Sequence, residues 1–168
     1  MKLYHGTKSS LSETIAEQGL QSRGKSGAEN KWKGKLESRP DAIYLTNVYS
    51  PYFAAQACDD PDDRWLIVEV DTLLMEGLMC PDEDYLEQIQ RAGGLTPHGA
   101  TMEQMTQFFR ENVHRYALAW EDSLGGLGTC SVISDIGITP DAITGIYLFD
   151  QTSADPHIVM QCLDPTIT

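Results

Sequence analysis

Apolar residues fall mostly into short runs of strand length along the chain. The clearest run is Trp65–Val70, which is almost continuously apolar and predicts a central strand over residues 64–71. Shorter runs rich in Val, Ile, Leu and Tyr predict further strands. These lie at residues 1–7, 42–46, 129–134, 143–150 and 157–163, and the first is expected to end in a turn at His5-Gly-Thr7.

Other segments have the composition or the three- and four-residue apolar spacing of helices. Residues 10–18 begin with Ser10-Leu-Ser-Glu13, which has the spacing of a capping box, and Gly19 suits the end of that helix. Ser50-Pro51 predicts a second helix, capped by the serine, over residues 50–58.

The rest of the chain adds a long loop and two further helices. Residues 21–41 are polar and contain three glycines, which predicts a loop. Residues 79–86 read as a turn that leads into a short helix over 84–91, and a longer helix is expected over 101–124, stopped by the glycines of Gly125–Gly128. Strands mixed with helices in this order predict an α+β fold, and the length predicts a single domain over residues 1–168.

Composition narrows the class of protein. With 41% apolar and 22% charged residues the chain resembles ordinary globular proteins, and no apolar run is long enough to span a bilayer. The N-terminal residues lack the pattern of a signal peptide, so we expect a cytoplasmic protein with no membrane partner. Its four cysteines and four histidines lack metal-ligand spacing, which predicts reduced thiols and no metal site; the oligomeric state is left open.

Charge is distributed unevenly. The net charge is −13, yet the first 40 residues contain eight basic and four acidic side chains. This segment would attract anions, whereas the acidic remainder would repel nucleic acid and polyphosphates. The alternative is that the lysines belong to a solvated loop without a ligand.

Several common catalytic sequences are absent. No glycine-rich Walker or Rossmann loop follows a strand, and no Gly-x-Ser-x-Gly elbow is present. What remains is a set of polar and aromatic residues near predicted strands: His5-Gly6-Thr7, Tyr44 and the acidic run Asp82–Asp84.

In order along the chain, Leu3–Thr7 (LYHGT), Ala16–Leu20 (AEQGL) and Ile43–Thr46 (IYLT) resemble the ADP-ribosyltransferase superfamily, in its His-Tyr-acid branch. That branch includes poly(ADP-ribose) polymerases, tRNA 2′-phosphotransferases and rifamycin ADP-ribosyltransferases. The layout is most similar to the rifamycin enzymes and to small bacterial and phage proteins of toxin or defence type. The resemblance covers about residues 3–87.

The resemblance implies an NAD-consuming transferase built on a split, bent β-sheet with flanking helices. In such a site His5 would hold a ribose of NAD, Gly6 would present its backbone to the carboxamide, and Thr7 would assist through its hydroxyl. Tyr44 would stack on the nicotinamide ring and Tyr52 would form a second aromatic wall. The diphosphate would contact cationic side chains, for which the candidates are Lys8, Arg23 and Lys25.

The third residue of the branch is an acid that stabilises the oxocarbenium ion formed as nicotinamide leaves. Polymerase-like members carry it on a late strand, where this chain has Gly145. The rifamycin-like layout puts it after the central strand, at Asp82, Glu83 or Asp84; we expect Asp84 first and Asp82 second.

Four readings of the function stay open at this point. The first is transfer of ADP-ribose to a nucleic acid, a protein or a small molecule. The second is an inactive module of the same fold that binds NAD, ADP-ribose or a protein. The third is an NAD-dependent RNA 2′-phosphotransferase. The arginines with which the tRNA 2′-phosphotransferases bind phosphate have no clear counterpart near His5 in this chain. The fourth is an unrelated acidic α+β domain.

Overall fold

The computed structural model describes residues 1–30, 38–85, 100–112 and 119–164. Contacts along the chain group into two compact units. Unit 1 is assembled from Met1–Gln21, Leu45–Glu76 and Ile136–Thr168. Unit 2 is assembled from Ser22–Tyr44 and Gly77–Asp135. Each unit contains both strands and helices, so the fold class is α+β, as predicted.

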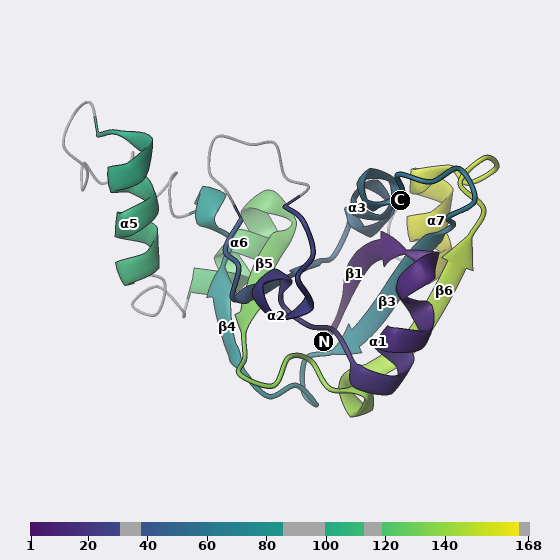
Figure 1. Ribbon diagram of the computed structural model, residues 1–168, viewed down its shortest axis with the longest axis horizontal. Helices are drawn as coiled ribbons and strands as arrows, with labels where there is room; N and C mark the ends of the chain where they lie inside the picture. The colour runs from purple at the N-terminus through teal and green to yellow at the C-terminus, as the bar shows by residue number, and fades with distance from the viewer. Residues whose placement is uncertain (31–37, 86–99, 113–118, 165–168) are drawn as a thin grey trace. The chain divides into compact units, whose positions relative to one another are not determined.

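The sheet of unit 1 contains the strand with the His-Gly-Thr sequence (Figure 1). This strand, β1 (Lys2–Lys8), pairs antiparallel along its whole length with β3 (Trp65–Asp71). The other side of β3 pairs antiparallel with β6 (Ile143–Phe149). On its other side β1 meets the end of β2 (Ala42–Thr46) at the pair Tyr4↔Thr46. Therefore β3 has a strand on both sides, as its apolar run predicts.

Short helices complete unit 1. They are η1 (Ser9–Leu11), α1 (Ser12–Gln18), α3 (Ser50–Ala57), η3 (Pro140–Ala142) and α7 (Pro156–Leu163). Both α3 and α7 pack against one face of the sheet, and Figure 1 shows these two helices beside each other. The buried residues that join them to the sheet are Tyr4, Ala54, Trp65, Ile67, Val159 and Met160.

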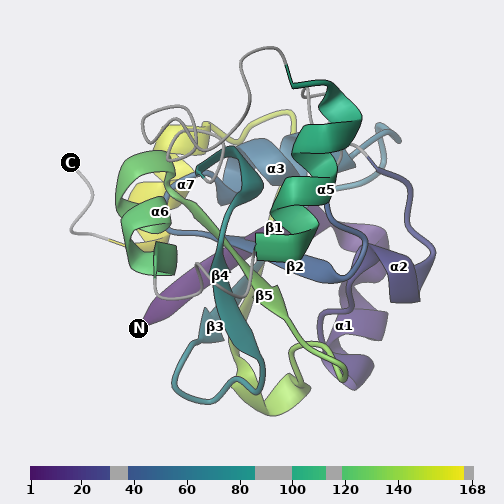
Figure 2. The same cartoon turned by 90° about the vertical axis from the view of Figure 1, so that its left-hand side faces the viewer.

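Unit 2 contains β4 (Leu78–Pro81) and β5 (Thr129–Ile133), which pair antiparallel and lie side by side in Figure 2. In the strand order β5 lies between β4 and β2. The helices of this unit include α2 (Arg23–Ser26), α5 (Met102–Asn112) and α6 (Trp120–Leu127), and residues 83–85 are also helical. The buried hydroxyl of Ser123 in α6 accepts from the Asp82 N–H at 3.0 Å and donates to the Thr129 carbonyl at 2.8 Å. It thereby ties α6 to the ends of both strands.

Most of the predicted strands are confirmed. The predictions over 42–46, 64–71, 129–134 and 143–150 agree with β2, β3, β5 and β6 to within one residue. The helix over 10–18 appears as η1 followed by α1, and Gly19 ends it with φ +77°, a conformation that favours glycine. The split, bent sheet of the resembled superfamily and the single domain over 1–168 stay predictions.

Three predictions about the strands are wrong. Residues 157–163 form helix α7, because the Asp155 carboxylate accepts from the backbone N–H groups of His157 and Ile158 and starts a helix. Residues 79–81 belong to strand β4. The expected turn at His5-Gly-Thr7 is also absent, since β1 continues in register with β3 to Lys8.

Other helix boundaries differ from the prediction. Gly125 and Gly126 lie within α6, and Gly128 ends it with φ +72°. Ser50 is the first residue of α3 rather than its N-cap, which is Tyr49. Within 10–18, Leu11 precedes α1 and makes no side-chain cap hydrogen bond, so the capping box does not form.

The two remaining predicted helices fall partly outside the described residues. The helix over 101–124 is represented by α5 and by α6, which has its own N-cap at Ala119; residues 113–118 are not described. The helix over 84–91 is described only to Tyr85. The predicted loop over 21–41 contains α2.

Candidate functional site

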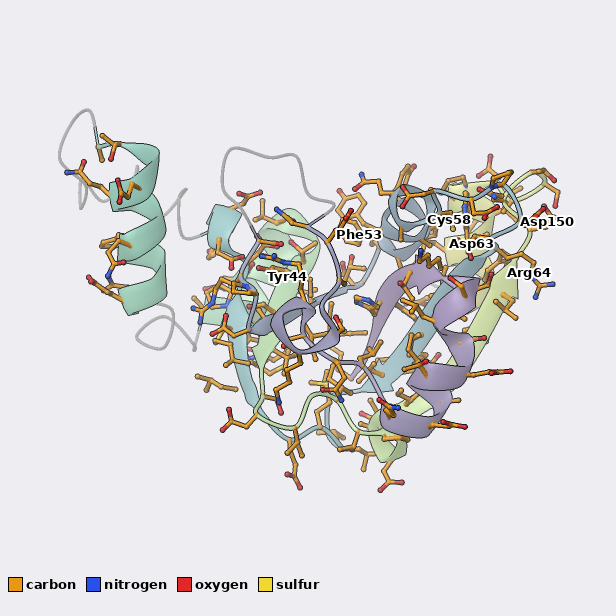
Figure 3. The ribbon with its side chains drawn as sticks, in the orientation of Figure 1. Tyr44, Phe53, Cys58, Asp63, Arg64 and Asp150 are labelled. Atoms are coloured by element: carbon orange, nitrogen blue, oxygen red, sulfur yellow. The ribbon has the colours of Figure 1, made fainter. Side chains whose placement is uncertain are left out.

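A phenol and a carboxyl group meet in unit 2. Tyr44 lies in β2, and Glu83 lies two residues beyond the end of β4. The Tyr44 hydroxyl donates a hydrogen bond of 2.7 Å to Glu83 Oε1 (Tyr44 is labelled in Figure 3). The Glu83 residue is only 7% exposed, so its carboxyl group has little contact with water. We take this acid–phenol pair as the centre of the candidate site.

The environment makes the Glu83 carboxyl group a weaker acid than an ordinary glutamate. Burial raises the pKa of its carboxyl group to about 7, and the nearby Asp82 charge acts in the same direction. The Tyr44 hydrogen bond and the Arg39 charge oppose this shift but do not cancel it. Burial and the Glu83 charge also raise the pKa of Tyr44 well above its usual range, so the phenol stays protonated and remains a donor. The pair can therefore take up or release one proton near neutral pH.

Arg39 supports the pair from the chain that precedes β2. Its backbone N–H donates to the Tyr44 hydroxyl oxygen at 2.7 Å, so this hydroxyl accepts one hydrogen bond and donates another. The guanidinium binds Asp41 through two parallel contacts, Nε to Oδ1 at 2.9 Å and Nη2 to Oδ2 at 2.6 Å. The Arg39 side chain is 9% exposed, whereas that of Asp41 is 54% exposed. Arg39 is thus a buried cation with a carboxylate on its solvent side.

Asp82 and Asp84, the two acids that flank Glu83, are joined by a hydrogen bond just after β4. Asp82 Oδ1 accepts from the Asp84 backbone N–H at 3.0 Å, and its carbonyl oxygen accepts from the Tyr85 N–H at 3.1 Å. These bonds lie at the start of the helix that follows β4 and is described as far as Tyr85, and the Asp82 carboxylate caps it. Burial raises the pKa of Asp82, although hydrogen bonds from Asp84 and Thr129 oppose the shift. Of the three acids left open by the sequence, Glu83 accepts the hydrogen bond from the Tyr44 hydroxyl.

The His5-Gly6-Thr7 sequence lies within β1 of unit 1. Because side chains alternate along a strand, His5 and Thr7 share one face and Gly6 lies on the other. A Cβ atom at Gly6 would overlap the Ser50 carbonyl oxygen, so the glycine permits close contact between β1 and α3. His5 is half-buried and pairs in register with Val68. The residue before His5, Tyr4, pairs with Thr46 of β2, whereas pairing with β3 continues to Lys8 at the end of β1.

The other residues predicted from the resemblance lie in separate surroundings. Tyr52 of α3 is 52% exposed, and its ring lies 6.2 Å from that of Tyr49 at an interplanar angle of 65°. Lys8 is the half-buried last residue of β1. Arg23 Nη2 donates to the Ser38 carbonyl oxygen at 2.7 Å in unit 2.

The sequence analysis missed a second buried carboxyl group, Glu69 in β3 of unit 1. It is 2% exposed and accepts from Lys2 Nζ at 2.8 Å, the Thr144 hydroxyl at 2.7 Å and the Tyr147 hydroxyl at 3.3 Å. Gly145 makes room for this arrangement, since a Cβ there would lie 2.6 Å from the Tyr147 hydroxyl oxygen. The signal was an acid inside the otherwise apolar run of residues 65–70.

Arg39 was missed for a different reason. In the sequence it is one of eight basic residues in the first 40, and nothing marks it as the buried one. Only its position two residues before Asp41 hinted at a local ion pair.

Within the described ranges, no group of three or more His, Cys, Asp or Glu residues is arranged to hold a metal ion. None of the helices described here combines the length and the apolar character required to cross a bilayer.

Comparison with known proteins gives no relative of this chain. No protein-family model, no curated protein and no solved structure matches it.

Proposed function

We propose that this protein is an NAD-dependent mono-ADP-ribosyltransferase. The observation that carries the proposal is the 2.7 Å hydrogen bond between Tyr44 and Glu83. The resemblance requires a tyrosine and an acid in one site, and it had left the acid open among three neighbours. A buried carboxyl group in contact with Tyr44 supplies a candidate for that acid.

The reaction breaks the C1′–N bond between ribose and nicotinamide. The bonding electrons leave with nicotinamide, which becomes neutral, and positive charge develops on the ribose. The acceptor then bonds to C1′ and loses a proton. An ionised Glu83 would stabilise the developing charge, and its low exposure strengthens that interaction, because a dry site screens charge weakly.

The remaining roles follow the resemblance. For unit 1, the resemblance would give His5 the binding of a ribose hydroxyl, Gly6 a backbone contact with the carboxamide, and Thr7 a supporting hydroxyl. The Tyr44 ring stacks on nicotinamide while its hydroxyl holds Glu83. Tyr52 is the proposed second aromatic wall, and its exposed ring is open to a ligand.

We favour Glu83 over Asp84 and Asp82 as the acid. The Asp82 carboxylate caps the helix after β4, and Asp84 donates its backbone N–H to that carboxylate. Glu83 has the contact with Tyr44 and the raised pKa that are typical of functional carboxyl groups.

The test measures release of nicotinamide from NAD by the wild type and by Glu83→Gln at pH 8. We expect the variant to lose about 100-fold or more in turnover, since removing one group that stabilises transition-state charge typically has this effect. Binding of NAD should change much less. Glu76→Gln, which alters an exposed residue by the same chemical change, is the matched control.

Asp84→Asn and Asp82→Asn test the two acids that the sequence favours. Loss of turnover in either of these, with Glu83→Gln fully active, would contradict our choice of acid. NAD binding without nicotinamide release in the wild type would favour the inactive module. Absence of NAD binding would refute the proposal as a whole.

The acceptor is found in the same system. Adenylate-labelled NAD is incubated with cell extract, which is then fractionated into protein, RNA, DNA and small molecules. Label in one fraction, lost in Glu83→Gln, identifies the acceptor class.

A further inference from the structure

Arg39 in unit 2 has hydrogen-bonding capacity that the described residues do not use. A guanidinium has two edges that can each bind an oxyanion through a pair of N–H groups. Asp41 occupies the edge formed by Nε and Nη2. Nη1 is buried and has no hydrogen-bond partner in the described part of the chain. The second edge is formed by Nη1 and the remaining Nη2 proton. On this edge Nη1 donates to no acceptor among the described residues.

Such an arrangement is unfavourable for a structural arginine. A charged donor that leaves water without gaining an acceptor loses its solvation and receives nothing in return. The carboxyl group of Glu83 is close enough to raise the pKa of Arg39, yet it makes no hydrogen bond to Nη1. The Asp41 hydrogen bonds, the leading cause of that raised pKa, all fall on the other edge.

We propose that the Nη1 edge of Arg39 binds a phosphate-class oxyanion of a ligand held beside Tyr44 and Glu83. The backbone N–H of Arg39 contacts the Tyr44 hydroxyl at 2.7 Å, which fixes the base of the arginine against the acid–phenol pair. A planar guanidinium edge matches two oxygens of one phosphate group, and binding there satisfies the unused donor.

The oxyanion has two chemical sources. It is either part of a dinucleotide diphosphate or a phosphate carried by the acceptor. Binding of an anion at Arg39 is measured directly and separately from turnover of NAD. A failure of the proposed transferase activity therefore leaves the anion site standing, and a failure of anion binding leaves the activity proposal standing.

The experiment titrates the wild type and Arg39→Gln with inorganic pyrophosphate by calorimetry at pH 6.5. We expect binding to the wild type and a roughly 10- to 100-fold weaker association with Arg39→Gln, the range typical of a hydrogen bond to a charged group. The matched control is Arg64→Gln, which makes the same change in charge at an exposed arginine of unit 1 that points away from the ribbon in Figure 3. Equal affinity in wild type and Arg39→Gln, or no binding to the wild type, overturns the proposal.

If Arg39→Gln does not fold, Asp41→Asn tests the same proposal. Asp41 is the exposed partner of the pair, so this change frees positive charge without removing the guanidinium. We expect pyrophosphate to bind Asp41→Asn more tightly than wild type and to raise its thermal midpoint further. Unchanged or weaker binding by this variant contradicts the proposal.

Competition identifies the source of the oxyanion. If ADP-ribose displaces pyrophosphate, the site takes a dinucleotide diphosphate. If both bind together, the site takes a phosphate of the acceptor. Either result supports an anion site at Arg39.

Discussion

Replacing Glu83 by Gln should change how the stability of the protein depends on pH. Burial raises the pKa of this carboxyl group from an ordinary 4.5 to about 7 in the folded protein. Between these values the folded state keeps the proton and the unfolded state releases it, so the free energy of unfolding falls as pH rises. By pH 8.5 both states are almost fully ionised and the loss is nearly complete.

The size of the effect follows from the two pKa values. One pKa unit corresponds to about 1.4 kcal/mol, and integration between pH 5 and pH 8.5 gives a loss of about 2.5 kcal/mol from Glu83 alone. The Gln side chain does not titrate over this pH range, and its carbonyl oxygen can still accept a hydrogen bond from Tyr44. The difference in unfolding free energy between Glu83→Gln and the wild type should therefore shift in favour of the variant by about 2.5 kcal/mol over this range.

Urea unfolding at pH 5, 6, 7 and 8.5, followed by far-ultraviolet circular dichroism, measures that difference. Glu76→Gln, which makes the same chemical change at an exposed residue, is again the control. A difference for Glu83→Gln that stays level across the series would falsify the reasoning. It would mean that Glu83 is ionised in the folded protein at all these values.

Three further predictions concern two glycines, a helix cap and the pH dependence of turnover. Gly6→Ala should lower the free energy of unfolding by about 3 kcal/mol, since the new methyl group overlaps the Ser50 carbonyl oxygen; Gly125→Ala, at a helical position with open space, should instead raise it by up to about 1 kcal/mol. Asp155→Ala should cost about 1 kcal/mol through loss of the α7 cap, and Asp155→Asn should restore most of it, both measured by urea unfolding. Turnover of NAD, if Glu83 must be ionised, should rise with pH through about 7 with unit slope, and a flat profile from pH 6 to 8 would count against that role.

The strands were predictable because their signal is local. Apart from Glu69, the run over residues 65–70 is apolar on both faces, which is typical of a central strand, and β3 buries all of it. The segment 156–163 shows the limit, because its apolar residues suit either a strand or a short helix. The Asp155-Pro156 pair at its start is a helix signal that would have decided the matter.

The candidate site was harder to predict than the fold. Tyr44 and the acidic run were both identified, yet choosing among Asp82, Glu83 and Asp84 requires knowing which way each side chain leaves the backbone after β4. That direction depends on the hydrogen bonds that Asp82 makes with Asp84 and with Ser123 of α6. Ser123 lies 41 residues from Asp82 along the chain. Burial of Arg39 likewise depends on packing across unit 2, which no local pattern encodes.

The buried carboxyl group of unit 1 has a consequence for how the chain responds to acid and alkali. Burial alone would raise the pKa of Glu69, but hydrogen bonds from Lys2, Thr144 and Tyr147 outweigh it and the pKa is lowered. Glu69 therefore stabilises the fold above its unfolded pKa and loses that contribution as pH falls, whereas Glu83 weakens the fold as pH rises. Acid therefore weakens the side-chain contacts that join Lys2, Thr144 and Tyr147 to Glu69 in unit 1, whereas mild alkali weakens the surroundings of Glu83 in unit 2.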